Sequence, residues 1–146
     1  MEDFKLIVRA AKTSEKRGFA SVEVDGESAT NVINSLVEIA DYHPTVKKLF
    51  LQSYWAYNMA GFKIKQSDCL NDLDEVKVSF INKGEKFGLT IDGGQPNAIL
   101  LIASMMDRYK FLHKLVSYVA NVDKMAENLS AIDDIIKEFN QEQGTN

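Results

Sequence analysis

The chain has 146 residues, a formal net charge of −4 and 45% hydrophobic residues, values typical of one soluble globular domain. At this length, folding removes roughly 70% of the surface of the unfolded chain from water, so a sizeable core can form. The sequence contains only two prolines and eight glycines, which excludes disordered, collagen-like and low-complexity classes. Its basic residues are scattered along the chain, so the charge pattern disfavours nucleic-acid binding.

The sequence shows no signal for a membrane or for secretion. The longest apolar stretch, 98–106, is far shorter than the about 20 residues that span a bilayer. Glu2 and Asp3 stand where a signal peptide has basic residues. A single cysteine, Cys69, excludes an internal disulfide framework and a multi-cysteine metal site. We therefore expect a cytoplasmic protein that spans no membrane.

The first 60 residues predict a hairpin followed by two helices. Apolar and polar side chains alternate over 4–12 and over 19–25, with a polar turn between them, as in two paired, half-buried strands. Apolar residues then recur at helical spacing to about Asp41. Pro44 cannot donate a hydrogen bond to that helix. We therefore expect a break at Pro44 and a second helix over 45–60.

The remaining residues repeat this order after a connector. The segment 61–75 loses periodicity and collects acidic and amide side chains, as a connecting segment does. Alternation over 76–81 and 87–91 predicts a second hairpin. Helical spacing of apolar residues follows from about 97 to 121 or beyond, and a last apolar stripe predicts a C-terminal helix over about 130–141.

The order strand, strand, helix, helix thus occurs twice, which predicts a tandem ββαα repeat with halves at about 4–60 and 76–126. Identical residues recur 66 positions apart in the helical stretches, as at Asp41 and Asp107. Two hairpins with one apolar face each can form a four-stranded antiparallel sheet with all helices on that face. The predicted fold is therefore a single two-layer α+β domain over 1–146.

Few residues could carry catalysis or hold a metal. His43 and His113 are the only histidines, and the position of His43 before Pro44 suits a turn. Cys69 has no adjacent histidine or basic residue that would activate its thiol. The acidic segment 68–75 lacks the glycine that calcium loops need. We therefore expect no catalytic, cofactor-binding or metal-binding residues, and a protein that is not an enzyme.

The predicted helix over 45–60 is unusual because it is apolar on two sides. One stripe, which includes Leu49 and Phe50, suffices to dock the helix on the sheet. A helix with a second apolar stripe is either wedged between two neighbours or presents that stripe to a partner. The alternatives here are burial beneath the C-terminal helix and an interface with another protein or a second copy. The candidate interaction surface comprises Leu51, Trp55 and Met59, with Tyr54 beside them.

Together these patterns favour a small acidic protein-interaction module that occupies a partner's surface. It would be a regulatory, inhibitory or immunity-type protein, and the excess of lysine over arginine indicates a low-GC bacterium or a mobile element. The runner-up is a binder of a small molecule or a lipid-like ligand, with an apolar cleft between the two halves lined by Phe50, Tyr54, Met105 and Met106. A flat exposed aromatic patch would favour the first reading, and a large unfilled pocket the second.

Overall fold

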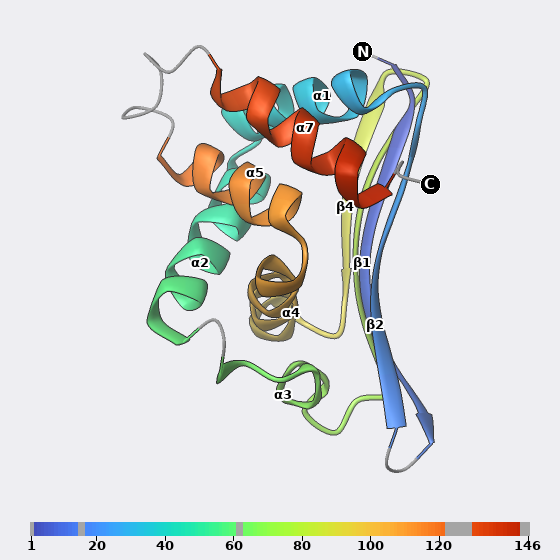
Figure 1. The fold of residues 1–146 in the computed structure, drawn as a ribbon. Helices are drawn as coiled ribbons and strands as arrows, with labels where there is room; N and C mark the ends of the chain where they lie inside the picture. Colours follow the sequence, from blue (N-terminus) through green and yellow to red (C-terminus); the bar gives the residue numbers. More distant parts are fainter. Residues whose placement is uncertain (1, 15–16, 61–62, 122–129, 144–146) are drawn as a thin grey trace.

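The computed structural model describes residues 2–14, 17–60, 63–121 and 130–143. A four-stranded antiparallel sheet carries helices on one of its faces (Figure 1). This arrangement confirms the predicted two-layer α+β class. The strands are β1 (Phe4–Ser14), β2 (Arg17–Gly26), β3 (Glu75–Lys83) and β4 (Lys86–Asp92), in the spatial order β2-β1-β3-β4.

The helices follow the hairpins, and the C-terminal helix lies within two residues of its predicted ends. The helical stretch predicted from about 97 to 121 differs from the prediction, because Tyr109 is extended and divides it into two helices. Among the described residues, no helix is both long and apolar enough to cross a membrane. The helices are α1 (Ala29–Tyr42), α2 (Pro44–Ala60), α3 (Gln66–Leu70), α4 (Gln95–Arg108), α5 (Lys110–Ala120) and α7 (Ala131–Gln143).

Alternation along the strands separates two kinds of side chain. Leu6 and Val8 of β1 and Val78 of β3 point toward the helices and are buried. Their chain neighbours Lys5 and Arg9 lie on the opposite, helix-free face. Because successive side chains of a strand point to opposite faces, this two-residue period sets which face of the sheet the helices cover.

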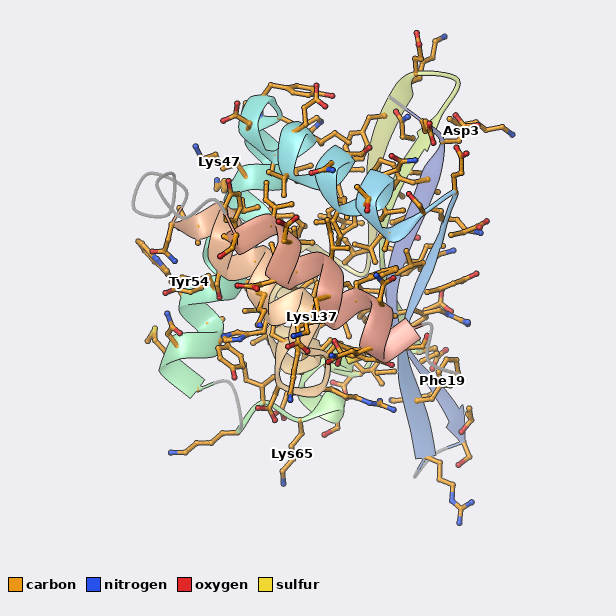
Figure 2. The ribbon with its side chains drawn as sticks, turned by 45° about the horizontal axis from the view of Figure 1, so that its top comes forward. Asp3, Phe19, Lys47, Tyr54, Lys65 and Lys137 are labelled. Atoms are coloured by element: carbon orange, nitrogen blue, oxygen red, sulfur yellow. The ribbon has the colours of Figure 1, made fainter. Side chains whose placement is uncertain are left out.

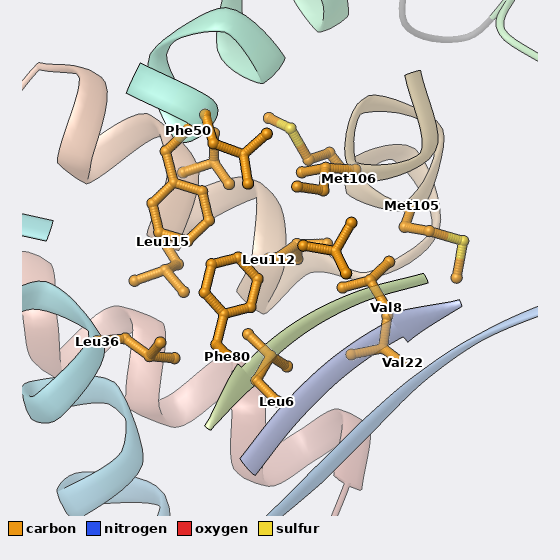
Figure 3. Packing of buried hydrophobic residues seen from close by; sticks show 14 of the residues in the cluster. Leu6, Val8, Val22, Leu36, Phe50, Phe80, Met105, Met106, Leu112 and Leu115 are labelled. Carbon is orange, nitrogen blue, oxygen red and sulfur yellow. The ribbon is translucent and has the colours of Figure 1, made fainter. Parts of the chain in front are cut away.

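The core lies between the sheet and the helices (Figure 3). Phe50 of α2 stacks on Phe80 of β3 with their ring centroids 5.4 Å apart. Met105 and Met106 of α4 and Leu112 of α5 complete this part of the cluster, and all five side chains are buried. Each such side chain contributes about 1.5–3 kcal/mol by leaving water, so burial of this cluster is the main force that holds helices to sheet.

The connector predicted over 61–75 is not wholly irregular, because it contains the short helix α3. The Asp68 carboxylate accepts a hydrogen bond from the Lys65 N–H at 2.9 Å at the start of α3. Asn71 ends the helix in the left-handed region, with φ 44°. Cys69 anchors the helix to the core and is buried. A five-residue helix is too short to show a periodic pattern, which is why the sequence did not reveal it.

The two halves share the same element order. α1 and α4 each have 14 residues, and each is followed by one residue in extended conformation, His43 and Tyr109. The N–H groups of these residues donate to the carbonyls of Ile39 and Met105 respectively. The two breaks are 66 positions apart, the offset found in the sequence. Origin by duplication stays a prediction, and 122–126 of the second half lie outside the described residues.

Candidate functional site

The α2 helix packs against α4 and α5, and its Phe50 reaches the sheet, where it stacks on Phe80 of β3. Its buried residues Val46, Leu49, Phe50 and Ser53 form one face. The Ser53 hydroxyl donates to the Leu49 carbonyl at 2.8 Å, so this face leaves no buried hydroxyl without a partner. The first apolar stripe therefore docks the helix, as its spacing predicted.

The second stripe of α2 faces away from the core. Trp55 is 61% exposed and Met59 is 86% exposed, whereas Leu51 and Tyr54 are half-buried at the border of the stripe. We call these four residues the α2 outer surface. The C-terminal helix α7, one of the two covers considered for this stripe, packs instead against α5 and α1. The alternative in which Trp55 is buried beneath the C-terminal helix is therefore wrong.

Positive charge lies beside the α2 outer surface. Lys47 and Lys48 are exposed, and α2 contains no acidic residue, although the whole chain carries a net charge of −4. Figure 2 shows Lys47 and Tyr54 on this helix, away from the sheet. The absence of acidic residues over 44–60 is visible in the sequence, and it is the signal that could have identified these lysines as part of the site.

Another large exposed hydrophobic residue has a partner within the chain. Phe19, on the helix-free face of the sheet, is 39% exposed. The guanidinium group of Arg9 lies over its ring, 5.2 Å from the centroid, in the geometry of a cation–π contact. Arg9 also pairs with the Glu75 carboxylate at 2.6 Å. This contact therefore accounts for Phe19 without a binding role, and the α2 outer surface stays the leading candidate.

Both histidines have structural partners. The Nδ1 atom of His43 accepts a hydrogen bond from the Val46 N–H at 3.3 Å, which satisfies one N–H of the first turn of α2. The ring of His113 packs on that of Tyr57 with centroids 4.8 Å apart. Among the described residues, no group of three or more His, Cys, Asp or Glu side chains could hold a metal ion.

Cys69 lacks the surroundings of a reactive thiol. Its sulfur lies 3.6 Å from the Lys65 carbonyl oxygen and 3.7 Å from the Ser104 hydroxyl. Burial raises the pKa of the Cys69 thiol, and the negative charge of Asp68 acts in the same direction. The thiol therefore stays protonated at neutral pH, and its position inside the core keeps it from substrates.

A wide, open cleft lined by described residues has both polar and apolar walls. It measures about 760 Å³ and lies between the far end of the β1–β2 hairpin and α3. Cationic and anionic side chains both line it, and they include Lys12, Arg17, Lys65, Asp68 and Asp72. A binding site for an apolar ligand needs mostly hydrophobic walls with a few polar groups. The many charged side chains of this cleft do not meet that requirement.

The apolar cleft considered between the two halves is filled by the residues that would line it. Phe50, Met105 and Met106 are buried in the core, where Phe50 stacks on Phe80. Of the four side chains considered, only Tyr54 is partly accessible. These side chains therefore do not form an open wall for a small-molecule or lipid-like ligand.

No family model, curated protein or solved structure matches the chain.

Proposed function

We propose that the protein is a non-enzymatic interaction module, of a regulatory or inhibitory kind, that binds a cytoplasmic partner protein through the α2 outer surface. The exposure of Trp55 carries this proposal. Tryptophan, tyrosine and methionine are enriched at protein interfaces, and a tryptophan anchor can contribute about 2 kcal/mol or more to binding. Trp55, Tyr54 and Met59 lie together on one helix, and the core already holds that helix by its other face.

The equivalent helix of the second half indicates what the partner looks like. α5 is covered by α7, whose Phe139 packs edge-on against Phe111 with ring centroids 5.0 Å apart. The Glu138 carboxylate of α7 pairs with Lys114 of α5 at 3.2 Å. An apolar stripe bordered by carboxylates therefore covers α5. We propose that the partner presents a helix of the same chemistry to α2, with its carboxylates near Lys48.

Trp55 is the only tryptophan, so its fluorescence reports directly on this surface. The probe is a synthetic peptide with the sequence of 130–143, which reproduces the apolar stripe and the acidic residues of α7. We expect a saturable blue shift of Trp55 emission as the peptide covers the ring. Replacing both Lys47 and Lys48 by glutamate should weaken peptide binding about tenfold or more, because it reverses the charge complementarity.

Two results would contradict the proposal. One is an emission spectrum that does not change at millimolar peptide. The other is equal affinity for the parent and the lysine-reversed variant. If the peptide displaced α7 from α5, Trp55 emission would stay unchanged, and this outcome would also contradict the proposal. A matched control, Lys137→Glu, changes the charge of an exposed lysine on α7 and should leave the peptide affinity unaltered.

A further inference from the structure

The two edge strands of the sheet differ in how their free edges are protected. β2 carries Arg17, Glu23 and Asp25 along its length. Between Lys86 and Asp92, β4 has no charged residue and no proline, and its pairing with β3 shows no register shift. Edge strands are usually blunted by charges, proline or bulges, because their free backbone groups can pair with another chain. The central part of β4 has none of these devices.

The hairpin turn determines which backbone groups of β4 point to the free edge. Gly84 and Glu85 both have positive φ, 58° and 65°, as the primed two-residue turns require. Lys83 and Lys86 close this turn, so the N–H of each residue donates a hydrogen bond to the C=O of the other. Bonding alternates along an antiparallel ladder, so every second residue of β4 from Lys86 onward bonds to β3.

The residues of β4 that lie between these bonded positions direct their N–H and C=O groups away from β3. These residues are Phe87, Leu89 and Ile91. Their side chains pack against the core cluster from the helix-covered face, but all three are only partly buried. Within the part of the chain that the structure describes, β4 therefore presents three residues with free backbone groups and with partly exposed apolar side chains.

Gly88 adds an independent observation. It lies in the middle of β4, is exposed, and has no φ in the left-handed region. A Cβ placed on it would meet no atom within 4 Å, so the packing of the described residues does not require glycine there. A glycine in the middle of a strand is destabilising relative to alanine, because it loses more conformational freedom on folding. Within strands it often marks a place where another backbone comes close.

We propose that two copies of the chain pair through β4, antiparallel, about a two-fold axis at Leu89. Leu89 then faces Leu89 of the second copy, and Phe87 faces Ile91, so the free backbone groups of both strands bond to one another. Gly88 faces Thr90 of the second copy in a pair without hydrogen bonds, where the two Cα atoms are only about 4.5 Å apart. The two sheets become one continuous sheet, with all helices on the same face.

Charge selects this register among those that the hydrogen bonds allow. In it, Lys86 lies directly opposite Asp92 of the second copy on the helix-free face, and symmetry repeats the pair. A slip of two residues keeps the backbone bonds but separates the two charges. None of the ion pairs between described residues uses Lys86 or Asp92. The ends of β4 are therefore self-complementary, and a second copy of this chain is the partner that they fit.

Charge reversal tests the pairing. We expect the parent protein to sediment as a dimer in analytical ultracentrifugation. Lys86→Glu places two carboxylates opposite each other, and Asp92→Lys places two ammonium groups opposite each other, so each variant should dissociate about tenfold more readily or more. An equimolar mixture of the two variants should form a mixed dimer, because both charge pairs are restored. The double variant K86E/D92K should dimerise like the parent.

Hydrogen exchange shows where the copies meet. The amides of Phe87, Leu89 and Ile91 should exchange slowly in the parent dimer and rapidly in Lys86→Glu, whose fold is checked by circular dichroism. A monomeric parent at millimolar concentration overturns the proposal, as does a dimer in which these three amides exchange freely. Dimers of both single variants with parental affinity would also overturn it. Trp55→Ala should leave the dimer intact, which separates this proposal from the function proposed for α2.

Discussion

α2 and α5 occupy equivalent places in the two halves, yet the outer face of α5 is covered and that of α2 is exposed. Phe111 of α5 is buried against Phe139 of α7, whereas Trp55 of α2 is 61% exposed. The apolar residues of α5 form one broad face, which includes Phe111, Leu115 and Val119, whereas those of α2 form two separate stripes. The difference teaches that α7 covers part of the broad face of α5, while the second stripe of α2 receives no such cover among the described residues.

The comparison of α5 with α2 predicts that the largest change in the free energy of unfolding occurs when a buried ring is removed. Phe111→Ala should lower the free energy of unfolding by about 3–5 kcal/mol, because it leaves a cavity between α5 and α7. Trp55→Ala should cost under about 1 kcal/mol, because most of the ring is already in water. Urea denaturation of both variants measures the difference. Equal losses would contradict the contrast between the two helices and remove the main support for an interaction surface on α2.

A smaller effect is expected where α7 caps α5. The two carboxylate oxygens of Glu142 accept hydrogen bonds from the N–H groups of Lys110 at 2.8 Å and Phe111 at 2.7 Å. Glu142→Ala should lower the free energy of unfolding by about 1–2 kcal/mol, because it leaves the first turn of α5 without these acceptors.

The control for this prediction is Glu138→Ala on the same helix. It breaks only the partly exposed ion pair with Lys114 and should cost under about 1 kcal/mol. Urea denaturation compares the two variants, and fluorescence follows α2 separately. Because α7 packs on α5 and α1 and not on α2, Trp55 emission should be unchanged in Glu142→Ala; a shift would show that the cover on α5 also supports the α2 outer surface.

The smallest effect on stability is expected at the contact between α2 and α5. His113 of α5 packs on Tyr57 of α2, and burial lowers the pKa of His113, with the charge of Asp107 opposing that change. The folded state therefore binds this proton less readily than the unfolded state does. Its contribution makes the fold less stable as the pH falls through about 6.5, the ordinary histidine pKa, toward the lowered value.

The measurement is urea denaturation of the parent and of His113→Gln over the range of about pH 7.5 to 5. The variant should lose part of the parent's decrease in stability over this range, because glutamine does not titrate. A parent and a variant with the same pH dependence would show that His113 is as easily protonated in the fold as in the unfolded chain.

The sequence by itself determined the features that depend on neighbouring residues. Alternation set which strand residues face the helices, as at Leu6 and Val8. Pro44 placed the break between α1 and α2, because proline restricts the residue before it and cannot donate. The α2 outer surface was also recognisable as a stripe that includes Trp55 and Met59, since helical spacing shows which side chains share a face.

Only the tertiary structure decided whether that stripe is covered. Helical spacing places Trp55 on a face, but α7 determines which helix receives a cover, and it packs on α5. The break at Tyr109 has the same origin. It has no proline, and the open N–H groups after it bond to Glu142, 32 residues beyond Lys110. Local sequence patterns show which side chains share a face of a helix or strand. Whether a remote helix packs on that face, or a remote side chain caps a helix, depends on how distant segments meet when the chain folds.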